Sequence, residues 1–209
     1  DKEKEKIDME KQTIISVGRE FGSAGHEIAE KIAKELGFNF YDRNMLDEIA
    51  QEKNIEVKYL EKYEEKPRNL ILSRSVKGYS NSLEEVIADM QFEYLRKKAD
   101  SGESFVVVGR CAEEVLKDRE GLISIFILGD REAKINRVKE KYQIDATEAL
   151  IKMKRHDKNR KRYHNRHSDG KWGDSRSYDL CVNSSKMGVD ETVDILVTYI
   201  RKRMQNREV

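Results

Sequence analysis

The chain has 209 residues, 39% of them charged and 37% hydrophobic, and a formal net charge of +1. This length allows one α/β domain with a sizeable core and a small inserted lobe, and the near-neutral charge gives no overall field toward nucleic acid or a membrane. No apolar run approaches the roughly 18 residues of a membrane helix, and the N-terminal "DKEKEKIDMEK" lacks the apolar core of a secretory signal, so we expect a soluble, cytoplasmic protein.

The first half of the chain predicts two strands, each followed by a helix. Residues 1–11 alternate in charge and are expected to be flexible, with a single domain over 12–209. A strand at 13–17 leads through a glycine-rich turn into a helix, whose apolar residues recur at helical spacing until Gly37. A short strand at 38–41 precedes a helix that begins near Asp42, and residues 58–80 are the least regular part.

The second half alternates apolar strands with helices. Strands are predicted at 104–109, 122–128 and 178–183, and helices at 81–100, 110–118, 130–142, 145–167 and 189–204. Near-continuously apolar strands separated by helices indicate a parallel sheet that is covered on both faces. Ligands of such folds bind beyond the carboxyl ends of the strands, where the loops 18–25, 109–110 and 129–131 are expected.

The two cysteines do not indicate a disulfide or a metal site. Cys111 and Cys181 are far apart in sequence and match no metal-ligand spacing. Both accompany strand-like runs, so buried free thiols are favoured over a disulfide or a nucleophile.

The segment "GREFGSAG" (18–25) has the character of a phosphate-binding loop. Its glycines would let backbone N–H groups close around phosphate oxygens, and the helix behind it would add its positive end. The full pattern G-x-x-x-x-G-K-[ST] is absent. By itself, the segment supports a phosphate loop and a plain strand-to-helix turn about equally.

The segment 152–167, "KMKRHDKNRKRYHNRH", is strongly basic. It has eight Lys or Arg residues, three of the chain's four histidines and one acid, Asp157. A run of this kind is usually a solvated helix face. Half of the eight are arginines, whose planar fork suits phosphate, and a polar loop follows at 168–179. A mobile arginine-bearing flap is what phosphoryl transfer uses to neutralise charge and exclude water.

Four stretches of the chain carry a family resemblance. They are "IISVGREFGSAGHEIAEKIAKELG", "FNFYDRNML", "FVVVGRCAEEVL" and "RHDKNRKRYHNRH…WGDSRSYDLCVNSS". In their order and spacing they resemble the cytidylate-kinase-like family of P-loop nucleoside monophosphate kinases. They look like its first strand, loop and helix, its second strand with an aspartate at the monophosphate site, its strand ending in Gly-Arg, and its arginine-rich lid returning to the last strand.

The resemblance implies an α/β three-layer P-loop NTPase fold. Its five-stranded parallel sheet would have the order 2-3-1-4-5, with a helical lid at about 152–177 and a small monophosphate-binding lobe at about 44–100. It also implies ATP-dependent phosphoryl transfer to a nucleoside monophosphate, CMP or dCMP or a related small acceptor, with Mg²⁺ bridging the phosphates. The partners would be nucleotides and no membrane, and the sequence carries no signal for an oligomeric state.

The resemblance also assigns roles to individual residues. The residues that would bind the ATP phosphates lie in the loop and the turn after it: Arg19, Gly22, Ser23, Ala24, Gly25, His26 and Glu27. The lid supplies Arg155, Arg160 and Arg162 for catalysis, with Asp157 orienting one of them. The residues that would bind the monophosphate are Asp42, Arg43 and Arg110. For Asp42, a role as the cap of the next helix is about equally supported.

The chain departs from the family at the loop and at the substrate strand. Aligned without gaps, the loop lysine of cytidylate kinases falls on Gly25 and their loop hydroxyl on Glu27; shifted by one, they fall on His26 and Ile28, so both groups are missing either way. Arg19 or His26 would then supply the cation, and only arginine is charged at every relevant pH. Where cytidylate kinases have Gly-Arg-Asp, this chain has Gly109, Arg110 and Cys111.

Two other functions stay open. The missing lysine and hydroxyl support a non-catalytic protein that senses a nucleotide on the same fold. The basic segment supports binding of RNA or DNA, with Tyr163 and Trp172 available for stacking. The near-neutral net charge makes nucleic acid the less favoured of the two.

Overall fold

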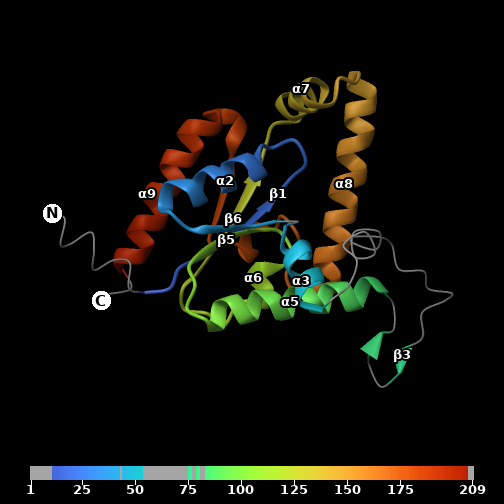
Figure 1. Ribbon diagram of the computed structural model, residues 1–209. Helices are drawn as coiled ribbons and strands as arrows, with labels where there is room; N and C mark the ends of the chain where they lie inside the picture. The colour runs from blue at the N-terminus through green and yellow to red at the C-terminus, as the bar shows by residue number, and fades with distance from the viewer. Residues whose placement is uncertain (1–10, 43, 54–74, 77–78, 81–82, 207–209) are drawn as a thin grey trace.

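The structure is a computed structural model and describes residues 11–42, 44–53, 75–76, 79–80 and 83–206. Its central sheet has the strand order β2-β5-β1-β6-β7, with all neighbours parallel (Figure 1). The strands are β1 (Ile14–Arg19), β2 (Asn39–Tyr41), β5 (Phe105–Val108), β6 (Leu122–Leu128) and β7 (Leu180–Asn183). Numbered along the chain they read 2-3-1-4-5, which confirms the predicted P-loop fold.

The helices of the described residues fall between these strands. They are α2 (Gly25–Leu36), α3 (Met45–Lys53), α5 (Leu83–Asp100), α6 (Ala112–Val115), α7 (Arg131–Tyr142), α8 (Ala146–His167) and α9 (Val189–Gln205). Short 3₁₀ turns lie at η1 (Ser175–Ser177) and η2 (Ser184–Lys186), and β3 (Ser75–Val76) pairs with β4 (Tyr79–Ser80) outside the sheet. None of the helices described is long and apolar enough to cross a membrane.

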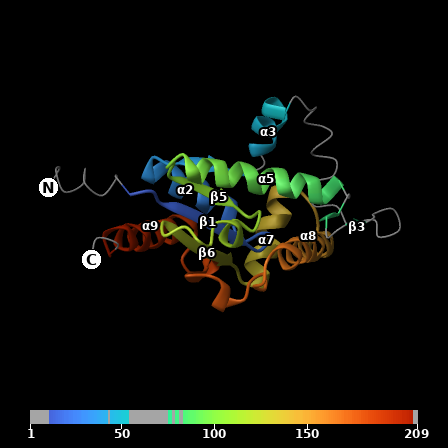
Figure 2. The same ribbon diagram turned by 90° about the horizontal axis from the view of Figure 1, so that it is seen from below.

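Side-chain alternation along the strands builds two cores, one on each face of the sheet. On β1, Ile14 packs with α3, α5 and α6, whereas Ile15 and Val17 pack with α2 and α9. Successive strand residues point to opposite faces, and both faces are apolar because both are covered. Figure 2 shows α5 on one side of the strands and α9 on the other. The outcome is the predicted three-layer arrangement.

The helices α7 and α8 pack on each other beyond the sheet. Their contact is a third apolar cluster, made of Ile135, Val138, Ala149 and Met153. The start of α8 is fixed by a capping box: Asp145 accepts from the Glu148 N–H at 2.8 Å, and Glu148 accepts from the Asp145 N–H at 3.3 Å. Figure 1 shows the pair beyond the ends of β1 and β6. This pair therefore covers the carboxyl edge, where ligands of such folds bind.

Several predicted boundaries differ from the structure. The first strand runs two residues further than predicted, to Arg19. The helix predicted at 110–118 is only α6, because Arg110 and Cys111 have φ of 62° and 51°, outside the right-handed helical region. The predicted lid falls on most of α8 and on η1, and the predicted lobe on α3 and α5. Residues 1–10 of the predicted flexible N-terminus lie outside the described residues.

Both cysteines are free thiols. Cys111 is buried, as predicted, and Cys181 is half-buried. Burial raises the pKa of both thiols, so neither is a ready nucleophile.

Neighbouring residues of α9 test the core that holds this helix to the sheet. Leu196 is fully buried and Ile195 is 48% exposed. We expect Leu196→Ala to lower the unfolding free energy by about 2–5 kcal/mol because it leaves a cavity, and Ile195→Ala to change it by about 0.5 kcal/mol or less. Urea denaturation of both variants measures the difference; equal losses would contradict the packing of α9.

Candidate active site

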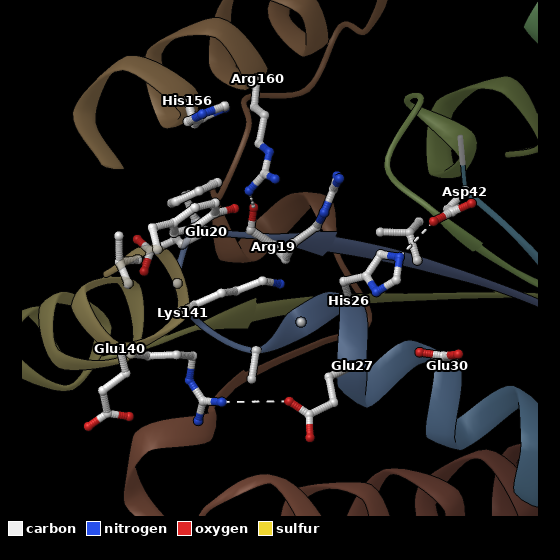
Figure 3. Close-up of a pocket in the computed structure, with 18 of the residues that line it drawn as sticks. Arg19, Glu20, His26, Glu27, Glu30, Asp42, Glu140, Lys141, His156 and Arg160 are labelled. Carbon is white, nitrogen blue, oxygen red and sulfur yellow. Dashed lines mark hydrogen bonds and ion pairs between the residues drawn. The ribbon is translucent and has the colours of Figure 1, made fainter. Parts of the chain in front are cut away.

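A cleft of about 950 Å³ opens at the carboxyl ends of β1 and β5 (Figure 3). Its floor is the loop between β1 and α2, and its walls come from α2, α7 and α8. Most of the predicted loop residues line it: Arg19, Gly22, Ala24, Gly25, His26 and Glu27. Asp42, Arg110 and Arg160 line it as well. The main candidates predicted from the sequence therefore lie at one site.

The backbone N–H groups of the loop divide into two sets. Those of Glu20, Phe21 and Ser23 have acceptors within the protein. Helix α2 begins at Gly25 without a side-chain cap, and no described residue accepts from the N–H groups of Gly25, His26 and Glu27. Since such a turn also carries the positive end of the helix dipole, the start of α2 provides anion donors at the cleft.

The side chain of Arg19 lies against two glycines. A Cβ built on Gly25 would be 2.4 Å from Arg19 Cβ, and a Cβ built on Gly109 would be 2.4 Å from Arg19 Nη1. The Arg19 stem therefore requires glycine at position 25, whereas a Cβ at position 109 would displace the flexible end of the arginine. The guanidinium of Arg19 consequently lies beside the segment that carries Arg110, rather than over the glycine-rich loop.

Arg110 belongs to a left-handed segment. Gly109, Arg110 and Cys111 have φ of 76°, 62° and 51°. For the two non-glycine residues this conformation costs roughly 1–2 kcal/mol each. Such strain is typical of functional sites, where the surrounding structure holds it in place. It positions the Arg110 side chain, which is only 7% exposed, at the edge of the cleft.

A buried polar contact connects this segment to α8. Glu113 accepts from Ser16 Oγ at 2.9 Å and from His164 Nε2 at 2.7 Å. Both side chains of the Glu113–His164 pair are less than a tenth exposed. The pair therefore links β1, α6 and the second half of α8 below the cleft.

His26 and Asp42 form a pair at the other side of the cleft. His26 Nε2 lies 2.6 Å from Asp42 Oδ2. Burial would raise the pKa of Asp42, but the Asn44 N–H and the His26 ring outweigh it and hold this pKa below its usual range. Asp42 accepts from the Asn44 N–H at 3.0 Å, in the turn just before α3 begins at Met45, and it also lines the cleft.

Side chains of helix α8 bind backbone groups of the loop. Asp157 Oδ1 accepts from the Phe21 N–H at 2.7 Å, and Arg160 Nη1 donates to the Arg19 carbonyl at 3.3 Å. The His156 ring stacks on the Phe21 ring at 4.3 Å and 7°. These α8 residues are three and four positions apart, which puts them on one face of the helix. The basic segment is therefore a helix docked on the loop.

Burial has the largest effect on the pKa of the Asp157 carboxylate in this contact. It raises the pKa of Asp157 above its usual range, although the Phe21 N–H and Arg160 act in the opposite direction. Asp157 also lies 3.9 Å from the Arg160 guanidinium, so it is placed to orient that arginine.

A second carboxylate ties the loop to the start of α7. Glu20 Oε2 accepts from Lys134 Nζ at 2.6 Å and from the Gly129 N–H at 3.1 Å. The Lys134 side chain is 11% exposed. The loop is thus fixed between two helices, with Lys134 of α7 on one side and Asp157 of α8 on the other.

Four predicted residues that the structure describes do not line the cleft: Ser23, Arg155, Asp157 and Arg162. Ser23 is buried and its hydroxyl donates to the Glu20 carbonyl at 2.9 Å. Arg155 is exposed, and Arg162 donates to Asn159 at 3.2 Å. These two arginines are seven positions apart, on a different face of α8 from Arg160. Arg43 lies outside the described residues. The roles assigned to these residues stay predictions.

Several residues that line the cleft were not among those expected from the sequence. They are Glu20, Phe21, Glu30, Val108, Arg137, Val138, Glu140, Lys141, Tyr142 and His156. The α7 members were missed because a helix after a parallel strand normally returns along the sheet. Their spacing was the one available signal, since Arg137 and Lys141 are four positions apart and share a helix face.

The side chains of the described residues do not form a metal cage of their own. No group of three or more His, Cys, Asp or Glu side chains gathers among them. Mg²⁺ in phosphoryl-transfer sites is bound through one or two protein carboxylates, water and the substrate phosphates. The cleft has carboxylates of that kind on α2, Glu27 and Glu30.

The fold and this cleft define a class of protein. A glycine-rich loop between β1 and α2, a 2-3-1-4-5 parallel sheet and an arginine-bearing helix over the loop are the parts of a P-loop kinase fold. Residues 14–186 match the cytidylate kinase-like family, and the chain belongs to that family. The resemblance seen in the sequence is thereby confirmed.

Solved structures support the fold. An uncharacterized protein from Eubacterium ventriosum is 41% identical, with a TM-score of 0.72 over 90% of this chain and 98% of that chain. A shikimate kinase from Acinetobacter baumannii in complex with shikimate is 13% identical, with a TM-score of 0.52 over 91% and 94%. A shikimate kinase from Bacteroides thetaiotaomicron is 11% identical, with a TM-score of 0.54 over 90% and 98%. The last two share only the fold. No curated protein sequence matches the chain.

Two substitutions at Asp157 separate its charge from its hydrogen bond. Asp157→Ala leaves the Phe21 N–H without its acceptor and should cost about 1–3 kcal/mol of unfolding free energy. Asp157→Asn keeps an acceptor oxygen and removes a charge whose burial is unfavourable, so it should cost less or should stabilise the protein. Urea denaturation at neutral pH measures both variants.

The same pair has an expected pH dependence. Because the folded-state pKa of Asp157 lies above its unfolded value of about 3.9, ionisation lowers the parent's unfolding free energy as pH rises from that value through the folded pKa. The advantage of Asp157→Asn over the parent should grow across this window and then level off. A pH-independent difference between the two proteins would contradict the raised pKa.

Proposed function

We propose that the protein transfers the terminal phosphoryl group of ATP to a small anionic acceptor. The acceptor class favoured by the family is a nucleoside monophosphate, with CMP and dCMP first. The proposal includes a cytoplasmic location, where ATP and nucleotides are available.

One observation carries the proposal. Arg19, Arg110 and Arg160, which come from β1, the strained segment after β5, and α8, all line the cleft. The same three also line a small pocket of about 30 Å³ next to it. Arginine forks match phosphate and carboxylate geometry, so their convergence favours an anionic ligand at the carboxyl edge of the sheet.

The described residues suit a reaction that works by positioning and charge neutralisation. The first turn of α2 would bind phosphate oxygens through its N–H groups. Arg160 would stabilise charge on the transferred group, with Asp157 as its positioning residue. Arg19 and Arg110 would bind the acceptor's anionic group. Mg²⁺, when bound, would neutralise charge between the phosphates, and Glu27 or Glu30 would hold it.

Two aromatic rings named for the nucleic-acid hypothesis contact other rings of the protein. The Tyr163 ring lies 4.8 Å from the His167 ring, and the Trp172 ring lies 5.3 Å from the Phe126 ring. These contacts support a packing role for both rings.

An acceptor panel tests the reaction. ADP release would be measured with ATP, Mg²⁺ and each of CMP, dCMP, UMP, AMP and GMP, together with small carboxylate-bearing polyols. We expect turnover with at least one phosphate-bearing acceptor, CMP or dCMP first. Turnover with carboxylates alone would correct the acceptor class.

The sensing hypothesis gives a different result in the same experiment. It predicts that ATP raises the thermal unfolding midpoint while no acceptor releases ADP. That combination would overturn the proposed transfer reaction and leave a nucleotide-binding protein.

Two glycines with the same backbone conformation test the role of Arg19. Gly109 has φ of +76° and lies against the Arg19 guanidinium, whereas Gly102 has φ of +78° and no atom within 4 Å of the place where a Cβ would stand. Alanine at either position should cost roughly 1–2 kcal/mol of stability. Only Gly109→Ala displaces the guanidinium, so only it should raise the acceptor KM, by about tenfold or more. Equal KM values for the two variants would contradict a role of Arg19 at the acceptor.

A further inference from the structure

The cleft contains a lysine that the sequence did not point to, Lys141 of α7. In phosphate loops of the usual pattern, a loop lysine reaches the terminal phosphates of the nucleotide. This chain has no lysine between Gly18 and Glu27. A protein that carries out the proposed reaction needs that charge from another element.

The other cations of the cleft have contacts within the protein, including Arg110, whose charge acts on Asp42. Arg137 Nη1 is 3.6 Å from Glu27 Oε2. Arg160 donates to the Arg19 carbonyl, and the Arg19 guanidinium lies beside Gly109. His26 is paired with Asp42. Arg19 and His26, the two side chains predicted to supply the missing charge of the loop, are therefore directed at protein groups or at the part of the cleft where the acceptor would bind.

Lys141 differs from these side chains. Figure 3 shows it extending into the cleft, with its ammonium directed toward the space between Arg19 and His26. Across the part of the chain that the structure describes, no hydrogen bond or ion pair involves its ammonium. Arg137, one turn earlier on the same helix face, lines the same wall. The free charge of the cleft thus comes from α7.

A close approach between the loop and α7 sets this geometry. A Cβ built on Gly22 would lie 3.0 Å from Val138 Cγ2 and 3.1 Å from the Lys134 carbonyl. The Tyr142 ring, next to Lys141, stacks on the Phe21 ring at 6.0 Å. Glycine at position 22 allows the loop to sit against the helix, which brings Lys141 over the loop.

We propose that Lys141 binds the terminal phosphates of ATP, and so replaces from α7 the lysine that the loop lacks. The inference rests on the proposed function, since it names the cation of that same nucleotide site. A lysine in the last turn of a helix also interacts with the helix dipole. That structural role applies equally to Lys139, which is in the same turn of α7 and does not line the cleft.

Calorimetric titration with ATP and with AMP, each with Mg²⁺ and without an acceptor, tests the assignment. Lys141→Met keeps the length of the side chain and removes its charge, Lys141→Arg restores a charge, and Lys139→Met is the matched control. We expect Lys141→Met to weaken ATP binding about 10- to 100-fold. AMP affinity should not change. Lys141→Arg should recover most of the ATP affinity, and Lys139→Met should match the parent.

The outcomes separate this inference from the function on which it rests. If the parent binds ATP and Lys141→Met binds it within about twofold, Lys141 has no role at the phosphates while the proposed kinase stands. Equal weakening by Lys141→Met and Lys139→Met would assign both lysines to the helix rather than to the ligand. If the parent does not bind ATP, the proposed function itself fails.

Discussion

The site depends on one steric constraint, the position of the Arg19 side chain between two glycines. Because this side chain lies 2.4 Å from where a Cβ would stand on Gly25, no larger residue fits there without displacing it. A side chain at position 25 is therefore incompatible with the observed position of Arg19, six residues earlier.

The same constraint links the substrate strand to the loop. A Cβ at Gly109 would displace the Arg19 guanidinium, and the left-handed φ of Gly109 starts the turn that continues through Arg110 and Cys111. The direction of Arg110 is thus set by a backbone that only surrounding contacts can maintain. Glu113, bound to Ser16 and His164, supplies such contacts directly after the turn.

The sequence was a good guide to the fold because apolar strands and helical periodicity are local signals. Strand order and the assignment of Asp42 and Arg160 to the site followed from the family resemblance, whereas the places of Arg19 and Arg110 followed from the rule that parallel strands end at one edge. The left-handed turn at Arg110 and Cys111 was not foreseeable, because neither residue type favours positive φ. The wall formed by α7 was missed for a different reason: its position depends on packing against α8 and Gly22, which no local pattern encodes.

The backbone of the loop explains why side-chain cations matter so much at this site. In a phosphate-binding loop the backbone N–H groups donate to the anion. In this protein, Asp157 accepts from the Phe21 N–H, and the Ser23 N–H is directed at the Glu20 carbonyl. The loop therefore offers fewer donors than its glycines suggest. What is left is the uncapped start of α2 and the charges carried by α7 and α8. Since these two helices share one apolar cluster with Phe21 packed against it, the charged side chains that face the cleft are positioned by the helix pair as much as by the loop.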